Sequence, residues 1–391
     1  MKSNLKVNFL GTELINPFIL ASAPPTKDYE TIRNAFNAGW AGAITKSIVL
    51  SPTRNKKSRI GHIRHQNNII ATQNYEMSSV YSPYQWKEWV IRLRNEFPDR
   101  LIFVSFAASS NIDEWKFLSE SFLETNVHGL ELNFSCPHSD HDRKGSAIGL
   151  DHNLCASITE AVKKTVGKKL KIMSKLPYIL HPNEGTVAKM CIEAGADAIA
   201  GINSIAGLCE IDPYELKPKL MTGDKTTTVG LSYHIIRSFG RLVITQIAKT
   251  IDWKRYPISA IGGVSRDIES IIDYLSLGAN HMQVCSEVMN HGVEVIDEMK
   301  ATLLQYLEKT GRTIDDIRGK ALPHFTEWDK LDSQDRIATV SDDCTNCQAC
   351  ISYCRYNAIM PGAAKINIVD KNCDGCGSCY SACPNNAISL N

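Results

Sequence analysis

Short apolar runs alternate with amphipathic stretches through most of the chain. Eight runs rich in apolar and β-branched residues predict strands, at residues 17–22, 42–47, 101–106, 129–134, 171–176, 198–203, 257–262 and 281–286. Segments with helical periodicity follow them, for example residues 29–38, 112–125, 153–166 and 268–276, and a longer helix is expected from Glu287 to Thr310. Eight such units predict a closed α/β fold, the (β/α)8 TIM barrel. The alternative is an open doubly wound sheet, which periodicity alone does not exclude.

Polar residues or glycines stand at the carboxyl end of nearly every predicted strand. One polar residue in such a place means little, but in a (β/α)8 barrel the carboxyl ends of all strands meet at one face, where the active site lies. The sequence therefore predicts one cavity lined by Ser22, Lys46, Ser105, Asn133, Lys175, Asn203, Ser204, Gly262, Gly263, Cys285 and Ser286.

The composition is typical of a globular protein with one large core and a small additional domain. Of the 391 residues, 43% are hydrophobic and 22% are charged, and nothing indicates disorder. The formal net charge of +1 favours neither nucleic acid nor a membrane surface as a partner. No apolar stretch reaches the roughly 18 residues that span a bilayer, and the amino terminus lacks the apolar region of a signal peptide. We expect a soluble, cytoplasmic protein.

Eight of the 13 cysteines fall into two copies of one spacing. The runs are Cys344-x2-Cys347-x2-Cys350-x3-Cys354 and Cys373-x2-Cys376-x2-Cys379-x3-Cys383. In such runs three cysteines hold one 4Fe-4S cluster and the fourth ligates the other cluster. Zinc knuckles or disulfides are the alternative, but zinc sites pair two Cys-x2-Cys hooks and a reducing cytosol keeps thiols free. We predict a ferredoxin-like domain with two 4Fe-4S clusters at residues 335–391, a linker at 311–334 and a barrel at 1–310.

Small residues after the last two predicted strands indicate a phosphate site. Gly262 and Gly263 let backbone N–H groups approach a ligand, and Cys285 and Ser286 precede a helix. Because iron-sulfur clusters carry single electrons and most organic reductions need two, a flavin is the expected converter, and FMN has one phosphate. The two lysines at strand ends could supply positive charge beside the reduced flavin, although a single buried lysine is as often part of an ordinary ion pair.

Seven short segments carry a resemblance to a known family. They are AITKS (43–47), QNYEM (73–77), ELNFSCPH (131–138), SKL (174–176), INS (202–204), AIGGV (260–264) and MQVCS (282–286). In this order they resemble the FMN half of the dihydropyrimidine dehydrogenase family, and the cysteine-rich segment stands where that family has one. The resemblance covers essentially the whole chain. It is strongest to the bacterial catalytic subunit, which works with a separate flavin and pyridine-nucleotide subunit; the class 1 dihydroorotate dehydrogenases are wider relatives without this cysteine-rich segment.

The resemblance implies reduction of the 5,6 double bond of uracil or thymine. Cys136 would be the general acid that protonates C5 while FMN N5 gives a hydride to C6, and a thiol of pKa about 8.5 is mostly protonated at neutral pH. Side-chain amides match the alternating donors and acceptors of a pyrimidine edge, and the implied substrate-binding residues are Asn74, Asn133, Phe134, Ser135, Asn203 and Ser204. The implied FMN-binding residues are Ser22, Lys46, Ser47, Lys175, Gly262, Gly263, Cys285 and Ser286. Electrons would come through the clusters from a partner reductase with FAD and NADH or NADPH, in a dimer or heteromer.

Three departures from the family pattern leave the substrate open. The chain reads Gly230-Leu231-Ser232-Tyr233 where the family has Gly-x-Ser-Gly near the flavin phosphate. Leu176-Pro177-Tyr178 replaces the family's Thr-Pro-Asn, and residues 207–228 differ as well. The alternatives are another conjugated cyclic substrate such as dihydroorotate or orotate, or a noncatalytic electron carrier. A carrier would not need the proton donor Cys136, which disfavours that alternative.

Other features have simpler interpretations. The basic run between residues 54 and 65 is expected to be a solvated loop. Cys155, Cys191 and Cys209 have no partners at a metal-binding spacing and are expected to be small buried or surface residues. No Gly-x-Gly-x-x-Gly follows a predicted strand, so the sequence gives no sign of a dinucleotide site and electrons are expected to come from another protein.

Overall fold

The chain forms two compact units, Met1–His324 and Phe325–Asn391. The computed structural model describes residues 4–52, 54–135, 146–179 and 183–391. The first unit extends further than the predicted barrel boundary at residue 310, because the short helix α11 (Ile314–Ile317) buries Ile314 and Ile317 in the barrel core. Thr313 caps this helix by accepting a hydrogen bond from the Asp316 N–H. The predicted linker at 311–334 therefore begins too early.

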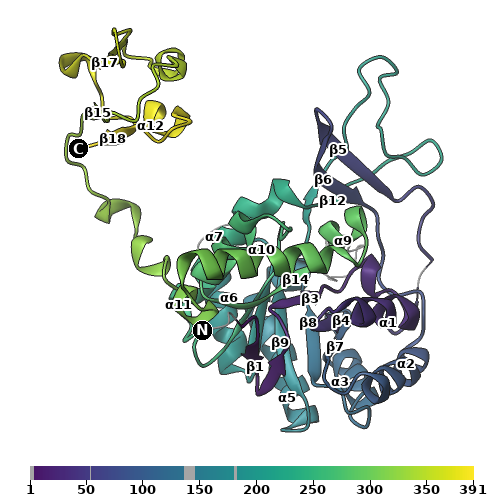
Figure 1. Ribbon diagram of the computed structural model, residues 1–391. Helices are drawn as coiled ribbons and strands as arrows, with labels where there is room; N and C mark the ends of the chain where they lie inside the picture. The colour runs from purple at the N-terminus through teal and green to yellow at the C-terminus, as the bar shows by residue number, and fades with distance from the viewer. Residues whose placement is uncertain (1–3, 53, 136–145, 180–182) are drawn as a thin grey trace. The chain divides into compact units, whose positions relative to one another are not determined.

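Eight parallel strands close into a barrel (Figure 1). Each overlaps one predicted run, and in chain order they are β3 (Phe18–Leu20), β4 (Gly42–Ile44), β7 (Leu101–Phe106), β8 (Gly129–Asn133), β9 (Lys171–Leu176), β10 (Ala198–Gly201), β13 (Ile258–Ala260) and β14 (Ala279–Val284). They follow one another around the barrel, and β14 pairs with β3 to close it. Every residue of β7 is buried, as expected of a strand covered on both faces. The predicted (β/α)8 barrel is confirmed.

Helices cover the outside of the barrel. The longer ones are α1 (Tyr29–Ala38), α2 (Pro83–Glu96), α3 (Ile112–Ser121), α5 (His152–Val166), α6 (Asn183–Glu193), α7 (Arg237–Thr250), α8 (Ile268–Ser276), α9 (Ser286–His291) and α10 (Val295–Thr310), and the short α4 spans Ser146–Gly149. Asp28 and Asp267 cap α1 and α8 through their side chains. The single helix predicted from Glu287 to Thr310 is wrong, because the chain breaks at Gly292, whose φ is +83°.

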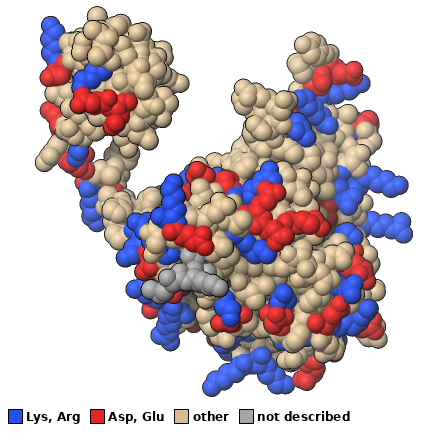
Figure 2. Space-filling model, in the orientation of Figure 1, with Lys and Arg blue, Asp and Glu red and all other residues tan. Residues whose placement is uncertain are grey.

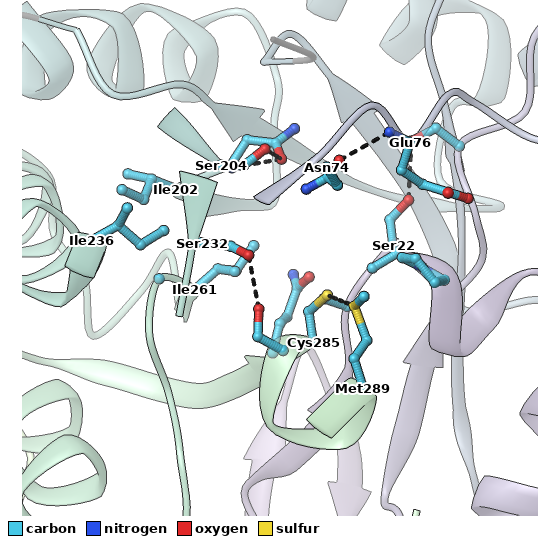
Figure 3. Close-up of a pocket in the computed structure, with 18 of the residues that line it drawn as sticks. Ser22, Asn74, Glu76, Ile202, Ser204, Ser232, Ile236, Ile261, Cys285 and Met289 are labelled. Carbon is cyan, nitrogen blue, oxygen red and sulfur yellow. Dashed lines mark hydrogen bonds between the residues drawn. The ribbon is translucent and has the colours of Figure 1, made fainter. Parts of the chain in front are cut away.

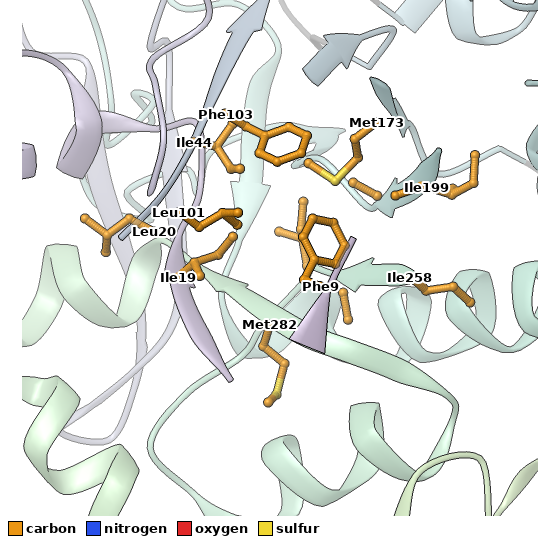
Figure 4. Packing of buried hydrophobic residues seen from close by; sticks show 14 of the residues in the cluster. Phe9, Ile19, Leu20, Ile44, Leu101, Phe103, Met173, Ile199, Ile258 and Met282 are labelled. Atoms are coloured by element: carbon orange, nitrogen blue, oxygen red, sulfur yellow. The ribbon is translucent and has the colours of Figure 1, made fainter. Parts of the chain in front are cut away.

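An amino-terminal hairpin contributes to the barrel core. It consists of β1 (Val7–Phe9) and β2 (Thr12–Leu14), and Asn280 Nδ2 donates to the Asn8 carbonyl at 2.8 Å. The Phe9 ring lies 5.8 Å from that of Phe103 and 4.3 Å from that of His281. Figure 4 shows Phe9 among core side chains from several barrel strands. The hairpin therefore adds an aromatic side chain to the packed interior.

A second, four-stranded antiparallel sheet lies outside the barrel, in the order β11 (Ile205–Gly207), β12 (Val229–Ser232), β6 (Asn68–Asn74) and β5 (Ile60–His65). The prediction of a loop for the basic run is wrong at β5, which pairs with β6 along its length. Since β5 has no buried residue, its sequence shows no apolar face that would have revealed a strand. Where β12 pairs with β6, Gly230 lies opposite Asn74 and Ser232 lies opposite Thr72.

Charge is mixed over the surface of the barrel unit. Basic and acidic side chains are interspersed on the face shown in Figure 2, in keeping with the formal net charge of +1. In the part of the chain that the structure describes, none of the helices has both the length and the apolar character needed to cross a bilayer.

The second unit repeats one small motif twice. Strand β15 (Ala338–Val340) pairs with β18 (Ile388–Leu390), and β16 (Ile359–Met360) pairs with β17 (Asn367–Ile368). A 3-10 helix, Ala349–Tyr353, stands in the first cysteine run where α12 (Ser378–Ala382) stands in the second. Equivalent residues of the two runs share positive φ angles, such as Gln348 at +61° and Gly377 at +79°. The two runs thus adopt the same local backbone.

Candidate functional site

A cavity opens at the carboxyl ends of the barrel strands. Its empty volume is about 940 Å³, solvent at the mouth included, within the range of ligand and cofactor sites. All eight predicted FMN-binding residues line it: Ser22, Lys46, Ser47, Lys175, Gly262, Gly263, Cys285 and Ser286. Figure 3 shows Ser22, which follows the first barrel strand, and Cys285, which follows the last, both facing this space. Closure of the barrel is what brings together residues from β3 to β14.

Four of the six predicted substrate-binding residues line the same cavity: Asn74, Asn133, Asn203 and Ser204. Phe134 does not; its ring packs 5.3 Å from that of Trp115 in the core, because successive side chains of a strand point to opposite faces. Ser135 is buried beneath the wall and donates from its hydroxyl to Asn133 Oδ1 at 2.8 Å. Ser135 Oγ also accepts from Asn203 Nδ2 at 3.1 Å. Ser135 therefore orients both amides instead of lining the cavity.

Cys136, the predicted general acid, lies outside the described residues. The described chain stops one residue before it, at Ser135, and resumes at Ser146. Its role therefore remains a prediction from the resemblance.

Both lysines of the cavity are paired with buried carboxylates. Lys46 Nζ lies 3.3 Å from Glu76 Oε1, and Lys175 Nζ lies 3.8 Å from Glu131 Oε1. Arg59 also pairs with Glu76, at 2.6 Å. The lysines thus form ion pairs and line the cavity at the same time, and their role beside a flavin stays a prediction. Their positive charges are fixed at the ends of β4 and β9, where they can face an electron-rich ring.

The Cys285 thiol is protonated in this environment. Burial raises its pKa to about 11, and the nearby charges of Lys46 and Lys175 act in the opposite direction. Cys285 Sγ lies 3.5 Å from Met289 Sδ, so two polarisable sulfur atoms form one wall of the cavity (Figure 3). A neutral thiol and a thioether suit a flat aromatic ligand better than a charged one.

Two consecutive glycines line one end of the cavity. Gly262 and Gly263 have φ angles of +122° and +75°, and a Cβ on Gly263 would lie 2.6 Å from the Tyr233 carbonyl oxygen. Only glycine fits so close an approach. The chain enters α7 from a 3-10 helix, His234–Ile236, and Arg237, the first residue of α7, donates its N–H to the His234 carbonyl, so the glycines provide the close backbone approach at this end. This end fits the single phosphate of FMN.

The sequence did not single out several cavity residues. Ile202, Ile236 and Ile261 form an apolar wall (Figure 3), which suits the flat face of an isoalloxazine ring. Glu76 and Gln283 also line the cavity. The sequence spacing could have identified both residues. Glu76 stands two residues after Asn74, and Gln283 stands two residues before Cys285, which places each pair on one face of an extended chain. The remaining wall, including the isoleucines, has no such local signal.

The eight cysteines of the second unit gather around two cavities. One, of about 340 Å³, is lined by Cys354, Cys373, Cys376 and Cys379. The other, of about 290 Å³, is lined by Cys344, Cys347, Cys350 and Cys383. Each cavity takes three cysteines from one run and the fourth from the other, which is the arrangement that the spacing predicts. Within the described residues, no group of three or more cysteine, histidine or carboxylate side chains is placed to hold a single metal ion.

Backbone N–H groups point at the cluster cysteines. The Ala358 N–H donates to Cys354 Sγ at 3.2 Å, and the Ala387 N–H donates to Cys383 Sγ at 3.2 Å. The two contacts are equivalent in the repeat. Hydrogen bonds to sulfur stabilise the more negative, reduced state of an iron-sulfur cluster and so raise its potential.

Comparisons with known proteins agree with this geometry. The family model of dihydroorotate dehydrogenase matches residues 4–307, and that of the 4Fe-4S dicluster domain matches residues 336–384. The chain is 30% identical over 341 residues to the chloroplastic dihydropyrimidine dehydrogenase (NADP(+)) of Arabidopsis thaliana, covering 83% of this chain and 78% of the relative. It is 26% identical over 363 residues to the NAD-dependent dihydropyrimidine dehydrogenase subunit PreA of Escherichia coli, covering 90% and 86%.

Two further relatives are dihydroorotate dehydrogenases. The catalytic subunit of dihydroorotate dehydrogenase B (NAD(+)) from Pyrococcus horikoshii is 28% identical over 328 residues, covering 82% of this chain and 99% of the relative. A crystal structure of DHODH from Eimeria tenella in complex with ferulenol matches with a TM-score of 0.68 at 19% identity, covering 82% and 89%, which is a likeness of fold. The chain therefore belongs to the dihydroorotate dehydrogenase family of oxidoreductases, with FMN in its barrel and two 4Fe-4S clusters in its second domain.

Proposed function

We propose that the protein reduces the 5,6 double bond of uracil or thymine to give the 5,6-dihydro base. The observation that carries this proposal is the set of side-chain amides and a hydroxyl on the cavity wall, Asn74, Asn133, Asn203 and Ser204. These groups offer both donors and acceptors, as a neutral ring with alternating N–H and C=O groups requires. The relatives from Arabidopsis and E. coli, which carry the name dihydropyrimidine dehydrogenase, support the same substrate class.

The ion pairs of the cavity favour a neutral base over orotate. Lys46 is already paired with Glu76, and Lys175 with Glu131. The carboxylate of orotate would have to compete with Glu76 for Lys46, and Glu76 itself lines the cavity and would repel it. Uracil and thymine need no such exchange, because a neutral ring buries no unpaired charge. Oxidation of dihydroorotate or reduction of orotate is the second candidate, supported by the family match and the relative from Pyrococcus.

Different residues of the chain bind the cofactor, orient the base and supply the proton. FMN, when bound, would supply the two-electron hydride chemistry. Gly262 and Gly263 would hold the phosphate, and Lys46 and Lys175 would place positive charge near the ring. Asn74, Asn203 and Ser204 orient the base, and Cys136 gives the proton.

Electrons reach the barrel through the two clusters from a partner reductase. The E. coli relative is named as a subunit of an NAD-dependent enzyme, and the sequence has no Gly-x-Gly-x-x-Gly after a strand. A separate subunit with FAD and a nicotinamide site would complete the path, in a heteromer. A noncatalytic carrier is the weaker interpretation, because it would have no use for a polar ring pocket beside the flavin site.

A half-reaction tests the proposed substrate. The purified protein is photoreduced without oxygen and mixed with uracil, thymine or orotate, and the flavin absorbance is followed. Uracil and thymine should reoxidise the flavin with formation of the dihydro base, and orotate should leave it reduced. The photoreduction makes the partner reductase unnecessary, so a negative result cannot come from its absence.

The outcomes separate the candidates. Reoxidation by orotate alone would overturn the proposal and favour a dihydroorotate reaction. If none of the three compounds reoxidised the flavin, reduction of these pyrimidines would be excluded, and the result would favour a noncatalytic electron carrier.

A further inference from the structure

Tyr233 holds a backbone conformation that side chains avoid. Its φ is +78° and its ψ is −150°, a region that is essentially restricted to glycine and costs other residues about 1–3 kcal/mol. Tyr233 stands where the resemblance expects the last glycine of Gly-x-Ser-Gly. The chain therefore keeps the glycine conformation but has a large side chain at this position. Something else in the structure must compensate for the strain.

The side chain of Tyr233 spans the phosphate end of the cavity. Tyr233 is only 5% exposed and lines the cavity. Its hydroxyl donates to Glu287 Oε2, at 2.6 Å, in the first turn of α9. The preceding residue makes a parallel contact, because Ser232 Oγ lies 2.8 Å from Ser286 Oγ. Two consecutive residues at the end of β12 thus bind two consecutive residues of α9.

Glu287 is fixed for this contact. Its side chain is fully buried, Arg266 Nε lies 3.4 Å from Oε1, and His291 Nε2 lies 3.9 Å from the same oxygen. Burial, and next the hydrogen bond to Glu287, raise the pKa of Tyr233, so the hydroxyl remains a donor at any working pH. A charged acceptor roughly doubles the strength of such a hydrogen bond.

We propose that Tyr233 and Glu287 form a latch that closes the phosphate end of the cavity and slows the release of FMN. The backbone of Tyr233 packs against Gly263, one of the two phosphate-site glycines. Opening the end for the phosphate to leave would separate β12 from α9 and break both contacts. Glycine at position 233 would adopt the same backbone without strain but would leave this end uncovered. The latch concerns the cofactor, so it holds whichever pyrimidine is the substrate.

The test is the rate at which FMN leaves the holoenzyme. The oxidised protein is diluted, and the gain in fluorescence of free FMN gives the rate constant for release. Tyr233→Phe keeps the ring and removes the hydroxyl, and losing a hydrogen bond to a charged group should speed release about tenfold or more. Tyr233→Gly should release FMN at least as fast, because it lacks both the ring and the hydroxyl.

Glu287 offers a matched pair of variants. Glu287→Gln keeps an oxygen that accepts from Tyr233 and should release FMN nearly as slowly as the parent, whereas Glu287→Ala should match Tyr233→Phe. Tyr84→Phe is the control, because Tyr84 is 73% exposed on α2. Parent-like release by Tyr233→Phe and Tyr233→Gly would overturn the latch. So would equal release rates for Glu287→Gln and Glu287→Ala, since both lose the charge that pairs with Arg266 and only glutamine keeps an acceptor for Tyr233.

Discussion

Cys136 follows Ser135 in the chain and is the proposed proton donor. Cys136→Ala leaves the described cavity residues in place, so the variant should retain FMN and both clusters. Without the thiol the ring must take its proton from a less suitable donor, and general acid catalysis contributes about 100-fold to 10,000-fold to such steps. Turnover of uracil should therefore fall by about 100-fold or more, measured by stopped-flow reoxidation of the photoreduced protein.

Two further variants test whether the loss of turnover comes from the loss of the Cys136 thiol. Cys136→Ser keeps a small polar side chain, but an alcohol is a much weaker acid than a thiol, so this variant should be nearly as slow as Cys136→Ala. Cys209→Ala is the control, because Cys209 packs with Tyr75, Leu220 and Val229 and does not line the cavity. Parent-like turnover of Cys136→Ala would show that another group supplies the proton.

The asparagines show what single residues reveal in the sequence and what they do not. Their polarity and position at strand ends predicted that Asn133 and Asn203 line the cavity, and the resemblance implied substrate binding by Asn74 as well. Their hydrogen bonds were not predictable, because the partners are remote: Asn133 Nδ2 donates to Ser47 at 2.8 Å, and Asn74 Nδ2 donates to the Gly230 carbonyl at 3.1 Å. Asn133 Oδ1 also accepts from Ser135, and Asn74 Oδ1 accepts from the Glu76 N–H, so these bonds fix the orientation of each amide. The sequence therefore predicted which side chains are polar and near the cavity, whereas the orientation of each amide depends on contacts that only the fold creates.

At the scale of the elements, a polar network crosses the interior of the barrel. Ser259 Oγ on β13 lies 2.8 Å from His281 Nε2 on β14, and Gln283 Nε2 donates to Ser259 at 2.9 Å. Gln283 Nε2 also lies 3.3 Å from Glu131 Oε2 on β8, and Glu131 pairs with Lys175 of the cavity. The network thus connects the barrel interior with the flavin site. Burial, and next the charge of Arg318, lower the pKa of His281 to about 3.

This pKa predicts how stability depends on pH. In the unfolded chain His281 would take up a proton near pH 6.5, but in the folded barrel it stays neutral down to about pH 3. The unfolded state therefore binds more protons in this window, and stability is lost as pH falls below about 6.5. Between pH 7 and 5.5 the loss from this one group is about 1 kcal/mol. Urea unfolding followed by tryptophan fluorescence measures it, since Trp40, Trp86 and Trp115 are buried in the barrel.

His281→Gln should flatten the dependence on pH, whatever it does to stability at pH 7. The difference in unfolding free energy between the parent and the variant should shift by about 1 kcal/mol against the parent as pH falls from 7 to 5.5. His128, whose pKa burial lowers to about 4, has the same effect and is unchanged, so the variant keeps part of the slope. Parallel curves would mean that His281 does not remain neutral in the folded barrel.

The barrel strands were predictable because each is a buried apolar run closed by a polar residue, as in β7 and β9. The sheet beside the cavity was not. Its strand β5 is largely exposed, and β12 reaches β6 only through pairs such as Gly230 with Asn74, which are far apart in the chain. Local periodicity carries no information about such pairing. The same long-range contact brings Ser232 and Tyr233 to the cavity.

At the scale of the whole molecule, the second unit depends on both cysteine runs together. Its buried core consists of Ala338, Cys350, Ile359, Ile366, Cys379 and Ile388. Two of these six are cluster cysteines, one from each run, so little apolar surface is left to hold the unit without its clusters. The barrel has its own core and should keep FMN when the clusters are lost.

Two double variants test how the runs share the clusters. Cys354 and Cys373 belong to different runs but line one cavity, whereas Cys344 and Cys354 belong to one run but line different cavities. The parent should contain about eight irons for each FMN. Cys354→Ala with Cys373→Ala should keep about four, and Cys344→Ala with Cys354→Ala should lose nearly all, because each cavity then lacks a ligand. Equal iron contents in the two variants would contradict the shared ligation. In both, photoreduction should still allow uracil to reoxidise the flavin, since the clusters are needed only to deliver electrons to the barrel.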